Sequence, residues 1–425
     1  MPSLIEDGKL SHLMMIPLTI FTFFLIAMIY SKKTKKVKLI INEEELRTRL
    51  ENYTPEPLAS VVNETYKEPN IPEHVTQSNN LCRSDYLCLT DSKEIKNIAT
   101  SCIKKYGVGS CGPRGFYGTI DLHLDLETRI AEFMNLEETV LYSYSLSTMS
   151  SAIIAYCKKG DMLFCDDKLA SSTIQSIAAA KSSVTFFKHN DVKDLEQKLI
   201  DFDKGQQNKK IKARKFLIIE GLYYRTGQMC PLVDLMKIRE KYKLRMFLDE
   251  SLSFGTIGSN GRGVTEHLNV DRSDIDLIVG SLEYGIPSIG GFCVGSNFVN
   301  EHQRLSGLGY CFSASLPPLH SAVAHRIIDM FETTPELFTK LHEIARNIHD
   351  KLADIEGFEV ISHPLSPKKV LKLDDMDAET FFDKALKAGV LFNNDEENIV
   401  SFNVNIKMDD EYIDNLMGLI KNVVQ

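Results

Sequence analysis

Two short apolar stretches of the sequence end in side chains that could take part in chemistry. Residues 245–248 and 275–280 are mostly apolar, which is typical of buried parallel strands. The first is followed by the carboxylate pair at 249–250, and the second by residues 281–284, Ser-Leu-Glu-Tyr. Ligands of open α/β sheets bind outside the carboxyl ends of the strands. The sequence therefore predicts a pocket lined by acidic and phenolic groups.

Four regions of the chain differ in their pattern of apolar and polar residues. Residues 96–319 alternate short apolar strands with amphipathic helices, which predicts an α/β fold with a doubly wound, mainly parallel sheet. Residues 320–425 begin with a long helical stretch and continue with short strands and helices, as in a smaller α/β domain. Residues 39–95 form a linker and amino-terminal segment with several prolines, and residues 1–38 hold an apolar stretch with a basic flank.

Bulk composition excludes some classes of protein. A chain of 425 residues can bury a large core. Its net charge of −9 argues against nucleic acid as a partner, because such proteins carry a basic face. The nine cysteines are scattered without a CxxC pair, which indicates reduced thiols and neither a disulfide framework nor a metal site.

The amino-terminal apolar stretch has the features of a membrane anchor. Residues 13–30 carry no charge and lie at the short end of what spans a bilayer, and residues 32–38 contain five lysines. The positive-inside rule then predicts a single-pass anchor with a lumenal amino terminus and a cytosolic chain. A cleaved signal peptide would need a basic region before the apolar stretch and a small-residue cleavage site after it, and the sequence has neither.

Several motifs together resemble the α-oxoamine synthases. These are fold-type I enzymes that use pyridoxal phosphate to join an amino acid to an acyl-CoA. The resemblance extends over residues 80–425 and is strongest at 105–125 and 245–320. Within the family, the chain is most similar to the non-catalytic large subunits of serine palmitoyltransferases. The matching segments read DESLSFG, GRGVTEH, SIGGFCVG and HQRLSGLGYCFSASLPP.

The family's catalytic lysine has no counterpart at the expected place. In the family, the turn after the second strand carries a lysine that forms a Schiff base with the cofactor. Here that position falls on Glu283 or Tyr284, and no lysine occurs between Lys243 and Lys340. A Schiff base requires a primary amine, which a carboxylate or a phenol cannot supply. The resemblance therefore implies no catalytic residue in this chain.

Other cofactor-binding positions of the family are also altered. Ser171 stands where the family has a histidine that stacks on the cofactor ring, and Met149 where an asparagine follows the phosphate-binding turn. Leu252 replaces the usual histidine of the DExHS motif. Asp249 remains where the family pairs a carboxylate with the pyridine nitrogen. We expect Asp249 to be a vestige of a cofactor site.

Two further segments are candidates for contact with a partner subunit. The glycine-rich loop at 107–118 resembles a family loop at the active site and dimer interface, so Cys111, Arg114 and Tyr117 are interface candidates; a purely connecting loop is the alternative. In the family, the FSxSLPP segment of one subunit reaches the cofactor phosphate of the other. The corresponding residues here are Ser313 and Ser315.

The resemblance implies a function shared between two chains. A homologous subunit that carries the lysine would hold pyridoxal phosphate covalently, and the pair would condense L-serine with palmitoyl-CoA to 3-ketosphinganine, the first step of sphingolipid synthesis. The expected location is the endoplasmic reticulum membrane, with membrane lipid, a small activator subunit and ORM-like regulators as further partners. Two alternatives stay open: an active homodimeric α-oxoamine synthase, and a non-enzymatic scaffold or regulator on this fold.

Overall fold

The computed structural model describes residues 23, 42–53, 79–207, 212–396 and 398–424. The chain divides into two compact units, residues 1–69 and residues 70–425. In the first unit, the short polar helix α2 (Glu43–Glu51) begins at Asn42, whose side chain accepts a hydrogen bond from the Glu44 amide. Among the described helices, none combines the length and the apolar character needed to cross a bilayer. The anchor predicted at 13–30 lies outside the described residues, apart from Phe23.

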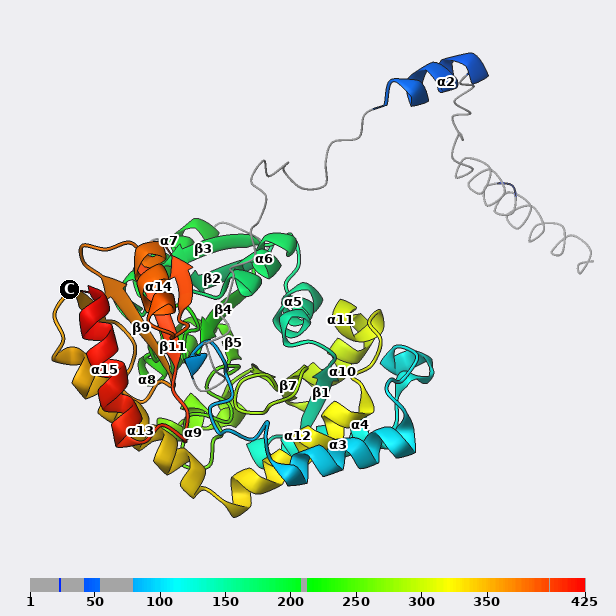
Figure 1. Cartoon of the computed structure of the whole chain (residues 1–425). Helices are drawn as coiled ribbons and strands as arrows, with labels where there is room; N and C mark the ends of the chain where they lie inside the picture. Colours follow the sequence, from blue (N-terminus) through cyan, green and yellow to red (C-terminus); the bar gives the residue numbers. More distant parts are fainter. Residues whose placement is uncertain (1–22, 24–41, 54–78, 208–211, 397, 425) are drawn as a thin grey trace, which may run out of the picture. The chain divides into compact units, whose positions relative to one another are not determined.

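A seven-stranded sheet forms the centre of the second unit (Figure 1). The five strands from β6 to β3 are parallel, which confirms the predicted mainly parallel sheet. β7 runs antiparallel to both of its neighbours, β6 and β1, so the sheet is mixed at one edge. The strands lie in the order β1 (Glu138–Tyr142), β7 (Gly291–Gly295), β6 (Leu277–Ser281), β5 (Arg245–Asp249), β4 (Lys215–Glu220), β2 (Met162–Asp166) and β3 (Ser183–Phe187).

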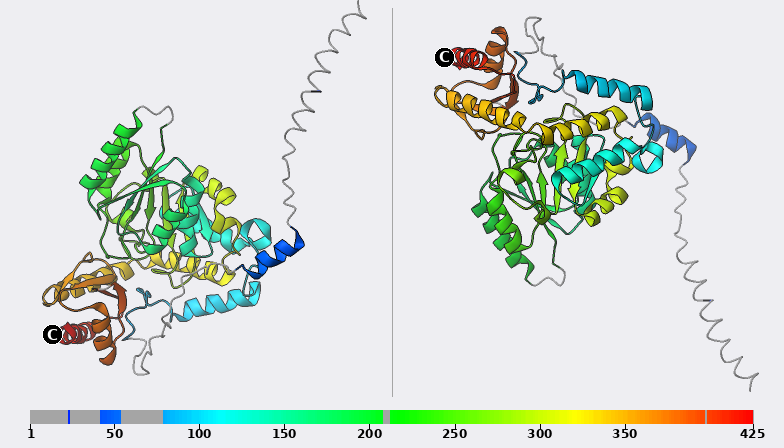
Figure 2. Two further views of the ribbon diagram at one scale, coloured as in Figure 1. Left: turned by 90° about the horizontal axis from the view of Figure 1, so that it is seen from above. Right: turned by 90° about the horizontal axis from the view of Figure 1, so that it is seen from below.

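Helices cover both faces of this sheet, which explains why its central strands are apolar throughout. Every residue of β6 and β7 is buried. In Figure 2, α7 (Val192–Gln206) and α8 (Leu232–Tyr242) lie on the opposite side of the sheet from α12 (Pro318–Thr333). The other large helices of this region are α3 (Lys93–Tyr106), α4 (Asp121–Met134), α5 (Ser145–Tyr156), α6 (Ser171–Ala179) and α10 (Asn297–Ser306).

A second, smaller sheet is built by the carboxyl-terminal part of the chain. Its antiparallel strands lie in the order β10 (Asn393–Glu396), β11 (Ile399–Asn403), β9 (Lys368–Leu373) and β8 (Phe358–Val360). α12 begins at Pro318 and packs against α3 and α4 of the larger region, and the domain boundary expected after residue 319 stays a prediction. The helices that accompany the small sheet are α13 (Glu336–Ala353), α14 (Ala378–Lys387) and α15 (Asp410–Val424).

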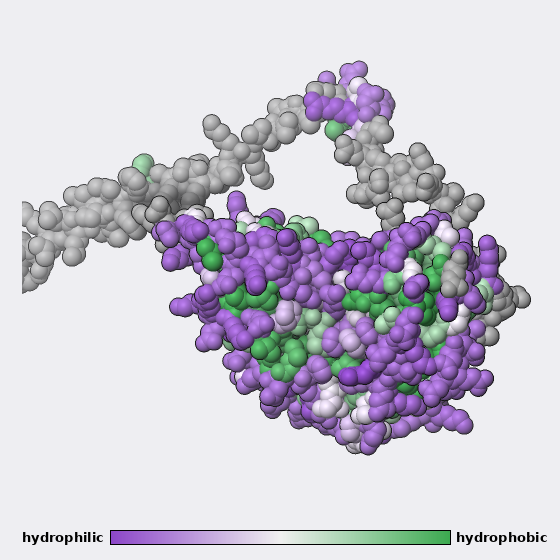
Figure 3. All heavy atoms as spheres, turned by 90° about the vertical axis from the view of Figure 1, so that its left-hand side faces the viewer, coloured by the Kyte–Doolittle hydropathy of each residue, from purple (hydrophilic) through white to green (hydrophobic). Residues whose placement is uncertain are grey.

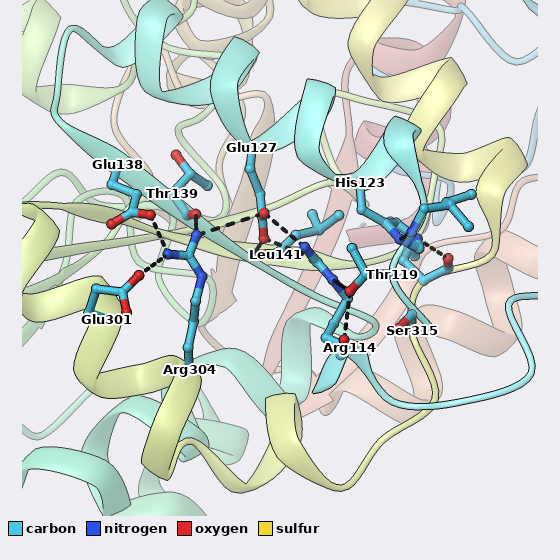
Figure 4. A network of polar contacts seen from close by, with 12 residues as sticks. Arg114, Thr119, His123, Glu127, Glu138, Thr139, Leu141, Glu301, Arg304 and Ser315 are labelled. Atoms are coloured by element: carbon cyan, nitrogen blue, oxygen red, sulfur yellow. Dashed lines mark hydrogen bonds and ion pairs between the residues drawn. The ribbon is translucent and has the colours of Figure 1, made fainter. Parts of the chain in front are cut away.

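A buried ion pair joins four segments beside the sheet (Figure 4). The Arg114 guanidinium donates to both carboxylate oxygens of Glu127 in α4, with each N–O distance at 2.9 Å. Glu127 also accepts from the Leu141 amide in β1 at 2.8 Å. Arg304 of α10 donates to the Thr139 carbonyl at 3.0 Å and approaches Glu127 at 3.8 Å. The loop before α4, α4, β1 and α10 are therefore held by one set of contacts.

The Arg114–Glu127 pair gives a prediction for stability. Substituting Glu127→Gln leaves a buried guanidinium opposite a neutral amide, and breaking a buried pair from one side is costly. We expect the free energy of unfolding to fall by about 3 kcal/mol, as measured by urea denaturation.

The matched control is Glu301→Gln, which removes a carboxylate that pairs with Arg304 at the surface, where 56% of the Glu301 side chain is exposed. Exposed pairs contribute at most about 1 kcal/mol. If both variants lost the same free energy of unfolding, burial of the Arg114–Glu127 pair would add nothing to stability.

A group of basic side chains lies where the small sheet meets the larger region. The His363 ring lies 6.5 Å from the His267 ring, between centroids. Burial, together with positive neighbours, lowers the pKa of His363 to about 4. The neighbours that act in this direction are His267, Lys369, His349 and Arg346.

From the lowered pKa of His363 we predict that the folded chain loses stability in mild acid. Because the pKa of His363 is lower in the folded chain than its ordinary value of 6.5, the unfolded chain binds the proton first as the pH falls between 6.5 and 4. Urea midpoints should therefore decrease over that range, and His363→Gln should weaken the decrease. His325→Gln, at a side chain that is 39% exposed, is the control for removing a histidine from the surface.

Candidate active site

A cavity of about 650 Å³ opens at the carboxyl ends of β4, β5 and β6. The first turns of α5 and α6 form one side of it, and side chains from the small sheet close it. The cavity therefore lies at the two strand ends that the sequence analysis singled out. The ionisable side chains that line the cavity are Glu220, Tyr224, Arg225, Asp249, Glu283, Tyr284, Lys368, Asp395 and Glu396.

The two carboxylates at the end of β5 have different roles, because successive side chains point to opposite faces of a strand. Asp249 lines the cavity. Glu250 is buried away from it and accepts hydrogen bonds from the Val264 and Thr265 amides at 2.9 and 3.0 Å. Glu250 thus caps the short helix α9 (Val264–His267) and is a structural residue.

Glu220 and Asp249 form a pair of neighbouring carboxyls on the cavity floor. They are register partners in β4 and β5. Glu220 accepts from the Ala170 and Tyr224 amides, at 2.5 and 2.9 Å. Burial, and next the charge of Asp249, raise the pKa of Glu220 to about 8, and burial also raises the pKa of Asp249. Both carboxyls therefore favour their neutral, protonated form more than a carboxyl in water does.

Lys368 reaches the cavity from the small sheet, which the sequence analysis did not foresee. Its ammonium nitrogen lies 3.0 Å from the Tyr224 carbonyl oxygen, 3.4 Å from the Asp395 carboxylate and 3.8 Å from the centre of the Tyr224 ring. Burial lowers the pKa of this amine. The absence of lysine from the residues after β5 does not exclude a lysine that enters the cavity from the other sheet. A usable signal was the pair Lys368-Lys369 at the start of an apolar strand.

Glu283 and Tyr284, the two residues at the expected lysine position, both line the cavity. The Ser145 hydroxyl, in the first turn of α5, donates to the Glu283 carboxylate at 2.6 Å. The Tyr284 ring lies 5.9 Å from that of Tyr224, and burial raises the pKa of the Tyr284 phenol. Neither side chain supplies an amine.

The lining residues do not fit pyridoxal phosphate held as the resemblance implies. Met149, Ser171 and Leu252, which the resemblance aligns with the family's cofactor-binding groups, all line the cavity. Lys368 is the one lysine among the lining residues, and it is engaged by Tyr224 and Asp395. The Glu283 carboxylate accepts a hydrogen bond from the Ser145 hydroxyl in the first turn of α5, where a phosphate would need positive partners.

The interface candidates of the glycine-rich loop differ in exposure. Cys111 and Tyr117 are exposed, and both adopt positive φ angles, 57° and 64°. Arg114 is buried and holds the loop from within through Glu127. At Gly118 a Cβ atom would lie 1.8 Å from the Gly112 carbonyl oxygen, so the close turn of this loop requires glycine.

The FSxSLPP segment is bound to that loop. The amide and the hydroxyl of Ser315 both donate to the Gly112 carbonyl, at 2.9 and 3.0 Å, and Ser110 donates to the Ser315 carbonyl at 3.1 Å. Ser315 is buried, whereas Ser313 is half-buried. The loop and the segment are therefore joined by hydrogen bonds into one surface.

Large apolar side chains are exposed around this surface. α11 (Leu308–Cys311) contacts α5, α10 and the helical turn at Arg114–Gly118. Figure 3 shows the side of the chain that carries α15, away from α11, where hydrophilic side chains dominate and hydrophobic ones form separate patches. We call the exposed set around α11 the apolar surface; it comprises Phe116, Tyr117, Tyr144, Leu146, Phe298, Leu305, Leu308 and Phe312.

Known proteins are similar to this chain in both sequence and fold. Residues 76–420 match the family model for aminotransferase class I and II. Long chain base biosynthesis protein 1 of Arabidopsis thaliana is 38% identical over 363 residues, which are 82% of this chain and 74% of the relative. Serine palmitoyltransferase 1 of Dictyostelium discoideum is 42% identical over 338 residues, which are 75% of this chain and 70% of the relative.

A solved structure gives the same result at the level of the fold. The serine palmitoyltransferase of Sphingomonas wittichii superposes with a TM-score of 0.73 and 25% identity, covering 80% of this chain and 86% of that one. The mixed sheet, the strand-end cavity and these relatives all point to the same family. The chain therefore belongs to the aminotransferase class I and II family and, within it, to the first-subunit branch of the serine palmitoyltransferases.

Proposed function

We propose that this chain is the subunit of a serine palmitoyltransferase that does not hold the cofactor, and that it completes the active site of a homologous, lysine-bearing partner. The pair would condense L-serine with palmitoyl-CoA and release carbon dioxide and CoA. The observation that carries the proposal is the turn after β6, where Glu283 and Tyr284 stand in place of an amine and Glu283 is bonded to Ser145.

The loop 107–118, the FSxSLPP segment and the apolar surface would form the face that meets the partner. Exposed aromatic and leucine side chains gathered on one side are typical of a protein interface. In the pair, Ser313 and Ser315 would face the partner's cofactor phosphate, and Cys111 and Tyr117 would lie at the rim. Because the Ser315 hydroxyl already donates to Gly112, Ser315 would act together with the loop that it holds.

Location and further partners belong to the same proposal. The apolar stretch at 13–30 and the lysines at 32–38 support a single-pass anchor in the endoplasmic reticulum membrane, with the amino terminus in the lumen. A small activator subunit and ORM-like regulators would then meet the complex at the membrane.

The location of the cofactor can be tested by borohydride trapping. We expect the co-purified pair to show the absorbance of an internal aldimine, and reduction followed by mass spectrometry should find the phosphopyridoxyl group on a lysine of the partner. This chain purified alone should show neither signal, because no strand-end amine is present. A reduced adduct on Lys368 or on any other residue of this chain would refute the proposal.

The interface can be tested at Phe312, which is 78% exposed within the apolar surface. Replacing Phe312→Ser removes a large aromatic contact, and such residues dominate interface energies. We expect the affinity for the partner subunit to fall by roughly tenfold or more in a titration by light scattering.

The matched control is Phe186→Ser. Phe186 is 42% exposed but lies in β3, at the opposite edge of the sheet from β1. This variant should keep the affinity for the partner, and both variants should keep their thermal midpoints near that of the natural chain. Equal binding by all three proteins would place the interface elsewhere.

A further inference from the structure

We propose that the Glu283 carboxylate acts as a built-in anion that closes the start of helix α5 to phosphate-bearing ligands. The inference deepens the proposed function and rests on it, because it explains how a chain of this fold would leave the cofactor to its partner. Loss of the amine alone removes the covalent bond to an aldehyde. It does not remove a binding site for phosphate.

The start of α5 is a place where an anion would be expected. The first amides of a helix lack partners within it and carry a partial positive charge, which attracts phosphates and carboxylates. The residue before α5, Tyr144, makes no side-chain cap. Ser145, Leu146 and Met149 of the first turns line the cavity, so this helix terminus faces the cavity.

The hydroxyl groups of the first turn are already committed within the chain. Ser147 and Thr148 donate back to the Tyr144 carbonyl, at 2.9 and 3.1 Å. Ser145 donates to Glu283 at 2.6 Å, which is a short, charge-assisted distance. A phosphate that entered here would find a carboxylate where it needs a hydroxyl donor.

The backbone that carries Glu283 is held in place on both sides of the residue. The Glu283 amide donates to the Ser281 hydroxyl at 3.0 Å, and the Ser84 hydroxyl donates to the Glu283 carbonyl at 3.3 Å. On the other side, β7 packs against the start of α5, since a Cβ atom at Gly291 would lie 2.4 Å from the Thr148 hydroxyl. These contacts fix the backbone at Glu283 and the first turn of α5, so the hydrogen bond between Ser145 and Glu283 is preorganised.

The other ionisable side chains of the cavity also have partners within the chain. At the start of α6, the Ala170 amide donates to Glu220, so a protein carboxyl also occupies the second helix terminus. The cations among the lining residues have carboxylate partners: Arg225 pairs with Glu396, and Lys368 lies 3.4 Å from Asp395. No lining cation is therefore left without an anion.

The test measures phosphate binding and needs no enzyme activity. The full chain and its Glu283→Gln variant are titrated with inorganic phosphate and with pyridoxal 5′-phosphate by calorimetry. Glutamine keeps the size of the side chain and removes its charge. We expect the variant to bind both probes tighter than the natural chain by roughly tenfold.

Two controls separate the helix terminus from the general charge of the cavity. Asp249→Asn changes a carboxyl on the same cavity that accepts from the Ser251 amide, and it should alter phosphate affinity by less than about twofold. Ser145→Ala removes the hydroxyl and keeps the Glu283 carboxylate, so it should not open the site. Circular dichroism establishes folding, and Glu283→Ala replaces Glu283→Gln if the latter does not fold.

The outcomes distinguish this inference from the proposed function. A folded Glu283→Gln chain that binds phosphate no better than the natural chain overturns the inference, and the trapping experiment on the pair is unaffected. Equal gains in Glu283→Gln and Asp249→Asn also overturn it, because the effect would then be one of total charge. Failure of the proposed function shows itself separately, as a covalent adduct on the natural chain.

Discussion

The buried pair of Arg114 and Glu127 is the contact on which the functional surface depends. Two charges taken out of water are tolerable only while they face each other, so the glycine-rich loop cannot detach from α4 without exposing an uncompensated charge to the interior. Through Leu141 and Arg304, the same pair is joined to β1 and α10. The loop then holds Ser315 through Gly112, which places the FSxSLPP segment.

Beside this framework lies a cavity that is formed by the carboxyl ends of β4, β5 and β6 and by the starts of α5 and α6, with Asp249 in its lining. The charges, however, are balanced within the chain: Glu283 at α5, Glu220 at α6, and the partners of Lys368 and Arg225. A fold can thus retain the architecture of an active site while its own side chains occupy the places of a ligand.

Much of this could be read from the residues, and some of it could not. The apolar patterns at 245–248 and 275–280 predicted β5 and β6, because strands buried on both faces need apolar side chains at every position. Glu283 and Tyr284 were expected beside a ligand site because they follow the carboxyl end of β6, where ligands of such sheets bind. Glu250 was indistinguishable from Asp249 by type and position, and only the alternation of faces in the folded strand separates a cap from a cavity residue.

By itself the sequence determined the fold class, the family and the absence of a strand-end amine, since these depend on local pattern and on residue identity. The tertiary structure alone decided that Lys368 enters the cavity from another sheet, that Arg114 is buried against Glu127, and that Glu283 meets Ser145. Each of these contacts joins segments far apart in the chain, and no local pattern records which distant residue a side chain will meet. The packing of the strands and helices determines which partners Lys368, Arg114 and Glu283 meet.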